Sequence, residues 1–130
     1  MATATRSDAN LALARQLFDW FTDHDIQSFM SVLAPDVEAH PSIAGAPVLT
    51  GREAVAEWWS RVASAGGEVE ARPLDFEARG DCVVVRGYLR HRSGRTLAES
   101  QVYWLYEIRD GQIVRMESHP TRPAALAACR

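Results

Sequence analysis

His40 is the side chain in this sequence best suited to acid–base chemistry. It ends a short segment, Val37 to His40, that we predict to be a strand stopped by Pro41. Imidazole titrates near neutral pH, so a histidine at such a strand end could accept a proton from a bound molecule. The alternative is that His40 only lines a pocket or bonds a backbone carbonyl before the proline.

Large aromatic side chains on two predicted helices could wall a site for a planar organic molecule. Trp58 and Trp59 are adjacent, and neighbouring helical positions differ by about 100° in direction, so the two rings cannot serve the same purpose. Ordinary core packing is the alternative for this pair. Trp20, on an earlier helix, could wall the mouth of the same site or pack on the surface or in a dimer.

Two further histidines, His24 and His91, could bind a ligand, but we expect both to face solvent. His24 lies between Asp23 and Asp25, but consecutive residues rarely converge on one ion, so we expect a solvated cap. His91 lies among three arginines, which we expect to face solvent, with an anionic ligand at the pocket rim as the alternative. The chain has no zinc-ligand spacing, phosphate loop or nucleophile motif. We therefore expect neither a metal nor a cofactor.

The composition is that of an ordinary globular domain. The 130 residues carry a net charge of -3, which argues against nucleic acid as a partner. No apolar run approaches the roughly 20 residues of a membrane span, and we expect a cytoplasmic protein. One domain over 1–130 is predicted, with an ordered core at about 8–120. Because Cys129 falls in an end expected to fray, we expect it to form neither a disulfide nor a zinc site with Cys82.

Three segments have the i, i+3, i+4, i+7 apolar spacing of one helix face. Their members are Ala14, Leu17, Phe18 and Phe21; Ile26, Phe29, Met30 and Leu33; and Val55, Trp58, Trp59 and Val62. Ser7 or Asp8 can cap the first helix, and Asp25 can cap the second. Thr50 and Glu53 have the spacing of a capping box for the third.

After Gly66-Gly67, which should end the third helix, the apolar period changes from helical to extended. The predicted strands are Glu68–Glu77, Cys82–His91, Thr96–Arg109 and Gln112–His119. Glycine-containing turns separate them, at Arg79-Gly80-Asp81, Ser93-Gly94 and Asp110-Gly111. Long strands joined in sequence by tight turns indicate an antiparallel meander.

The segment Thr96–Arg109 carries apolar bulk on both of its faces. Val102, Trp104, Tyr106 and Ile108 alternate on one face. Tyr103 and Leu105 lie on the other. A sheet that is apolar on both sides needs cover on both sides. The helices can cover one side, and we expect a second subunit to cover the other, making a homodimer.

Several short segments together resemble a known superfamily. They are Leu17 to Met30, Leu33 to Glu38, Thr50 to Val55 and Ile108 to Val114. In order and spacing they are similar to the SnoaL-like members of the nuclear-transport-factor-2-like superfamily, which includes ketosteroid isomerase and limonene epoxide hydrolase. The resemblance implies an α+β cone, with a curved antiparallel sheet wrapped around three helices and an internal pocket.

The chain departs from ketosteroid isomerase at the positions of its catalytic residues. The isomerase's general base falls at His40, where the carboxylate is replaced. Its oxyanion donors fall near Leu17, which donates nothing, and Trp104, which has only an indole N–H. Because an oxyanion hole usually takes two donors, we do not expect ketosteroid-type isomerisation.

SnoaL-like cyclases place an acidic residue on the last strand, pointing into the pocket. Here the corresponding position holds Ser118, and Glu117 should point outward. A one-residue bulge would reverse this and bring Glu117 and His119 inside. Both arrangements are open from the sequence.

We therefore predict a small apolar or aromatic organic ligand inside the cone, with cofactor-free acid–base catalysis of the isomerase, cyclase or hydratase type. His40 would be the base. The predicted ligand-binding residues are Leu17, Trp20, Trp58, Trp59, Val102, Trp104, Met116 and Ser118. The alternative is a non-catalytic binder or dimeric accessory module. A third interpretation is a structural dimerisation module whose cone is filled by its own side chains.

Overall fold

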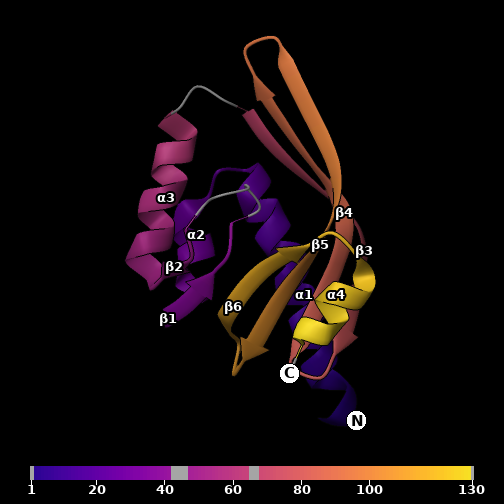
Figure 1. Cartoon of the computed structure of the whole chain (residues 1–130). Helices are drawn as coiled ribbons and strands as arrows, with labels where there is room; N and C mark the ends of the chain where they lie inside the picture. The colour runs from indigo at the N-terminus through magenta and orange to yellow at the C-terminus, as the bar shows by residue number, and fades with distance from the viewer. Residues whose placement is uncertain (1, 42–46, 65–67, 130) are drawn as a thin grey trace.

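The computed structural model describes residues 2–41, 47–64 and 68–129, in which the three predicted helices and the meander appear in the predicted order, with β2 and α4 as additional elements. Figure 1 shows the helices α1 and α2 followed by β1, β2 and α3, and then a meander of long strands closed by α4. The elements are α1 (Ala2–Thr22), α2 (Ile26–Ser31), β1 (Leu33–Ala39), β2 (Leu49–Thr50), α3 (Arg52–Ser64), β3 (Glu68–Arg79), β4 (Cys82–Ser93), β5 (Thr96–Arg109), β6 (Gln112–His119) and α4 (Arg122–Ala128). No described helix is long and apolar enough to cross a membrane.

Within these ranges, six strands form one curved, open sheet in the order β2-β1-β6-β5-β4-β3. The four meander strands pair antiparallel, as predicted. β1 joins the sheet beside β6 and runs parallel to it, so the sheet is mixed rather than wholly antiparallel. The α+β cone expected from the sequence is confirmed.

Local sequence explains where the helices begin. The Asp25 carboxylate accepts hydrogen bonds from the Ser28 amide at 3.1 Å and the Ser28 hydroxyl at 2.6 Å. These bonds lower the pKa of Asp25, and the predicted cap of α2 is confirmed. α1 begins at Ala2, earlier than the predicted caps. The side chain of Val62 and the Gly66-Gly67 stop lie outside the described residues.

The start of α3 differs from the predicted capping box. Thr50 is the last residue of β2 and pairs with Glu38 of β1. Gly51 follows with φ of +94°, and its amide bonds the Val37 carbonyl at 2.7 Å. α3 therefore begins directly from a strand, and it contacts β1, β2 and α2.

The main core lies between the helices and the inner face of the sheet. It contains the residues predicted for that face of β5, namely Val102, Trp104, Tyr106 and Ile108. Phe18 of α1 packs edge-on against three rings of the sheet, with centroid distances of 5.9 Å to Phe76, 5.0 Å to Trp104 and 6.0 Å to Tyr106. The inner face predicted from the two-residue alternation is confirmed.

The outer face of the sheet is covered by a helix that the sequence interpretation missed. α4 lies across the face opposite α1 (Figure 1), and Ala125 packs against Cys82, Val84 and Leu105 in a second cluster. Leu105 is fully buried. The expectation that a second subunit covers Leu105 is corrected, because the chain's own C-terminal segment does so.

The cysteine prediction was wrong. Cys82 and Cys129 form a disulfide that joins the start of β4 to the residue after α4, with 6.0 Å between their Cα atoms. The prediction failed because it treated the C-terminal segment as frayed. Thr121 instead caps α4 by accepting a hydrogen bond from the Ala124 amide at 3.3 Å, and the helix docks on the strand that carries Cys82.

Candidate functional site

The predicted ligand-binding residues divide into buried and partly buried groups. Leu17, Val102 and Trp104 are buried in the main core, with exposed fractions of 1%, 7% and 7%. The others stay partly accessible, and all of them except Ser118 pack against this core. They are Trp20, Trp58, Trp59, Met116 and Ser118. The partly accessible members therefore come from α1, α3 and β6, and the buried ones come from α1 and β5.

The indole ring of Trp104 packs closely against the backbone of Gly87. These residues lie on the paired strands β5 and β4, where Gly87 is opposite Val102. A methyl group on the Gly87 Cα would come within 2.7 Å of the Trp104 ring and would overlap the Arg72 carbonyl oxygen of β3. Glycine is needed here because two neighbours occupy the space of a side chain.

The two tryptophans of α3 stay at the margin of the core. Trp59 packs between Phe21 of α1, at 5.1 Å between ring centroids, and Phe29 of α2, at 4.9 Å. It therefore joins the helices to one another instead of lying between helix and sheet. Trp58 also packs against the core, and both indoles are only partly buried.

The register of β6 decides which of its side chains face the cone. Ser118 is paired with Trp104, and Glu117 is paired with Leu105. Trp104 belongs to the inner core and Leu105 to the outer cluster. Ser118 therefore lies on the inner face and Glu117 on the outer face. A shift in register occurs between Glu107 and Ile108, which is too far from Ser118 to reverse its direction.

His40 does not lie with the aromatic residues of the cone. Its Nε2 atom is 2.8 Å from Oε1 of Glu38 and 3.9 Å from Oε2 of Glu117, which places the ring on the outer side of the sheet. The physical reason is strand alternation, because the preceding residue, Ala39, fills the inner face. The backbone amide of His40 bonds the Met116 carbonyl at 2.8 Å, and its side chain is 37% exposed.

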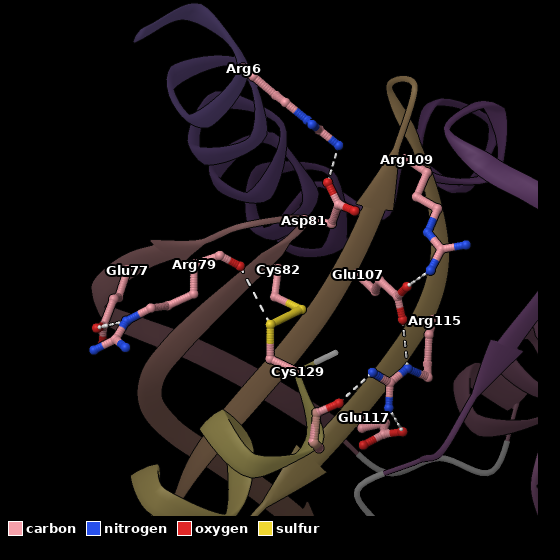
Figure 2. The surroundings of a disulfide bond; sticks show 11 residues. Arg6, Glu77, Arg79, Asp81, Cys82, Glu107, Arg109, Arg115, Glu117 and Cys129 are labelled. Atoms are coloured by element: carbon pink, nitrogen blue, oxygen red, sulfur yellow. Dashed lines mark hydrogen bonds and ion pairs between the residues drawn. A yellow bond between two sulfur atoms is a disulfide. The ribbon is translucent and has the colours of Figure 1, made fainter. Parts of the chain in front are cut away.

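A buried ion network lies beside His40 on the outer face. Arg115 donates from Nε to Glu107 at 3.0 Å and from Nη1 to Glu117 at 2.6 Å, and from Nη2 to the Ala128 carbonyl of α4. Glu117 also contacts His119 at 2.9 Å. Figure 2 shows Arg115 between the two carboxylates, on the side of β6 toward Cys129. Sequence reasoning considered Glu117 together with His40 or His119 and missed Arg115 and Glu107, which become their neighbours only once the β5–β6 register is known.

The network changes the acidity of its members. Burial raises the pKa of the Glu117 carboxyl, but hydrogen bonds from His119 and Arg115 outweigh burial and hold that pKa below its usual range. For Arg115, burial lowers the pKa, and the bonds to Glu117 and Glu107 more than reverse this. Both groups are therefore held in their charged forms.

Two surface hollows lie outside the predicted binding residues. One, of about 290 Å³, is on the outer face beyond α4. It is lined by Glu70, Arg72, Leu74, Tyr88, Arg90 and Glu99. The other, of about 390 Å³, lies between α1 and the β5–β6 turn. Among the residues placed by the structure, no cluster of three or more His, Cys, Asp or Glu side chains could hold a metal ion.

The fold is shared with proteins of known structure. The TerC structure, co-crystallised with polyporic acid, is similar at 28% identity and a TM-score of 0.75, over 92% of this chain and 96% of that one. A candidate polyketide cyclase from Sinorhizobium meliloti, protein SMa1630, is similar at 25% identity and a TM-score of 0.71, over 83% and 94%.

A third structure extends the comparison of folds alone. Bal32a, from a soil-derived mobile gene cassette, has a TM-score of 0.80 at 18% identity, over 93% of this chain and 95% of that one. No curated protein matches the sequence. The family profile described as the SnoaL-like domain matches residues 14–116. The chain belongs to the SnoaL-like family.

Proposed function

We propose that this protein binds a small apolar or aromatic organic molecule between α1, α3 and the inner face of the sheet. The observation that carries the proposal is the pair of indoles on α3. Both Trp58 and Trp59 pack against the core, yet each keeps accessible surface. Partly exposed rings beside an apolar interior are a typical lining for an organic ligand.

The family comparison supports the same class of ligand. TerC was co-crystallised with polyporic acid, which makes this compound a rational first probe. The side chains proposed to line the site include no carboxylate, lysine or arginine. Ser118 is the one hydroxyl among them, so recognition would depend on ring contacts and few hydrogen bonds.

Binding can be tested by NMR, because four indole N–H groups report on the chain. Addition of polyporic acid should move the signals of Trp58 and Trp104, and Trp58→Leu should weaken binding. Leu97→Ser is the matched control, since Leu97 is 51% exposed and far from the proposed lining in the β4–β5 hairpin. Equal loss of affinity in both variants, or no indole shift with any organic probe, would reject the cone as the site.

The catalytic form of the proposal assigns proton transfer to His40. A hydrogen bond from Nε2–H to Glu38 would fix the tautomer and leave Nδ1 as the proton acceptor. His40 is directed to the outer face, however, and the lining on the inner face has no acid–base pair. The non-catalytic binder is therefore the second candidate function, favoured by the position of His40.

Ring signals of the histidines separate these two forms. If His40 serves a ligand in the cone, polyporic acid should shift its ring signals and leave those of His24 and His91, which are exposed, unchanged. A bound ligand that shifts the indoles and none of the histidines would support the binder without acid–base chemistry.

We also propose a homodimer, now through the part of the outer face that α4 leaves open. Leu74 is 44% exposed and Tyr88 is 37% exposed there. On β3, the negative Glu70 and the positive Arg72 are two residues apart. A two-fold axis that passes between them would place Glu70 of one subunit opposite the partner's Arg72. Sedimentation should find a dimer for the wild type and a monomer for Tyr88→Arg, and a wild type that is monomeric at micromolar concentration would refute the interface.

A further inference from the structure

α4 covers apolar surface that it can protect only while it stays docked. Beneath it, Cys82 and Leu105 are fully buried and Val84 is 3% exposed. The helix has only seven residues, and a helix this short is not stable in water without tertiary contacts. Its position therefore depends on tertiary contacts, which are the packing of Ala125 on the sheet and the attachments at its two ends.

The N-terminal attachment is an ion pair on the surface. Arg122, the first residue of α4, donates from Nε and Nη2 to Glu77 of β3 at 2.8 to 3.1 Å. Hydrogen bonding from Arg122 lowers the pKa of Glu77 despite an opposing effect of burial. Both side chains are partly exposed, so solvent and salt screen this contact.

The C-terminal attachment is the disulfide between Cys129 and Cys82. Figure 2 shows the disulfide beside Arg115. The carbonyl oxygen of Ala128, which precedes Cys129, accepts a hydrogen bond from Arg115. Arg115 is only 8% exposed. The two adjacent residues Ala128 and Cys129 therefore provide both the disulfide and the third hydrogen-bond partner of the buried Arg115 guanidinium.

Through Arg115 the disulfide is connected to the histidine pair. Arg115 holds Glu117, and Glu117 lies 2.9 Å from His119 and 3.9 Å from His40. Loss of the Ala128 carbonyl would leave a buried guanidinium with one partner fewer, which is costly unless water enters. A change at Cys129 would thus reach His119 through contacts within hydrogen-bonding distance, and His40 through an ion-pair contact of 3.9 Å.

We propose that the Cys82–Cys129 disulfide is a redox latch: its reduction releases α4, opens the outer face and loosens the hold of Arg115 on Glu117 beside His40 and His119. This inference does not depend on the proposed ligand. Cys82 has no exposed surface, whereas Cys129 is partly exposed, so an external reductant would reach the sulfur of Cys129 first.

The exchange needs a dithiol reductant. One of its thiolates attacks Sγ of Cys129, the S–S bond breaks, and Cys82 leaves as a thiolate that takes up a proton. The second thiol of the reductant then attacks the mixed disulfide and releases Cys129 as a thiol. In total the protein gains two electrons and two protons, and the dithiol becomes a disulfide.

Hydrogen exchange with and without dithiothreitol tests the latch on the full chain. After reduction, shown by alkylation of two thiols, amides in Arg122–Ala128 should exchange roughly tenfold faster or more, while those of α1 should not change. The signals of the Arg115 Nε–H and of the His40 and His119 rings should move at the same time.

Two variants serve as controls. Cys129→Ser should behave as the reduced protein and should not respond to dithiothreitol. Arg122→Ala keeps the disulfide, so its α4 should remain protected until the reductant is added. The latch is overturned if α4 stays protected after both thiols are alkylated, if reduction unfolds the whole domain, or if the cysteines stay unlinked in the folded, air-oxidised protein.

Discussion

Replacing Gly87 with alanine should destabilise the domain although the new side chain is a single methyl group. At an ordinary strand position, Gly→Ala stabilises a protein by about 0.4–1 kcal/mol, because it reduces the conformational freedom of the unfolded chain. At Gly87 the methyl group would overlap the Arg72 carbonyl oxygen and lie 2.7 Å from Cζ3 of Trp104. Contact at that distance is strongly repulsive, so the sign of the effect should reverse.

The size of the stability loss depends on whether the atoms around the new methyl group can shift. Overpacking a core costs about 1–3 kcal/mol, and the tighter of the two contacts here is with backbone, which cannot rotate away. We therefore expect a loss of about 2–3 kcal/mol, near the top of that range. With an unfolding entropy of about 2.1 cal/mol/K per residue, the 130 residues turn this loss into a drop in Tm of about 7–11 °C.

Urea unfolding and calorimetry of the wild type and Gly87→Ala measure this directly. The double variant Gly87→Ala/Trp104→Phe separates the two contacts, since phenylalanine lacks the ring atom at 2.7 Å but leaves the Arg72 carbonyl in place. Compared with Trp104→Phe alone, the double variant should still be clearly less stable. A Gly87→Ala protein as stable as the wild type, or more so, would show that β3 and the indole do not close over Gly87 as described.

Three other perturbations test separate parts of the structure. Trp59→Ala should lower the free energy of unfolding by about 3 kcal/mol in denaturant titrations, and a loss below about 1 kcal/mol would mean that the indole does not join α3 to the other helices. The pKa of Glu117 is lowered in the folded protein, so its contribution to stability is present above the unfolded value of about 4.3 and is lost as the pH falls through the folded value. The stability of Glu117→Gln should therefore fall less steeply than that of the wild type in acid, and parallel acid-unfolding curves would contradict the assignment. Leu105→Arg should unfold or aggregate the protein, because Leu105 is fully buried under α4; a folded variant with native circular dichroism would show that α4 does not cover it.

Much of the fold was predictable because its pattern is local. Asp25 caps α2 through Ser28, the third residue of the helix, and such a cap needs only neighbouring residues. The alternation of Val102, Trp104 and Tyr106 likewise places all three on the inner face, since strand geometry fixes it at two residues. The inner face of β5 predicted from strand periodicity therefore agreed with the structure, whereas Leu33, predicted on the face of the second helix, begins β1.

The candidate site was less predictable, because it depends on pairing between distant segments. His40 was expected in the cone, but the parallel pairing of β1 with β6 sets Ala39 opposite Met116 on the inner face and leaves His40 on the outer one. The sequence left undecided whether the Ser118 side chain faces inward or outward, and its pairing with Trp104 places it on the inner face. Neither register is encoded in the residues next to these positions.

The sequence by itself determined the order of the first three helices and the four meander strands, the inner face of the meander and membership of the SnoaL-like family, since each depends on short-range spacing. The tertiary structure alone decided what lies on the other side of the sheet. α4, the disulfide between Cys82 and Cys129, and the network around Arg115 form from segments far apart in the chain. A short C-terminal segment has too little periodicity to predict a helix, and it acquires one because docking on the apolar outer face of β4 and β5 supplies the stability that its sequence lacks.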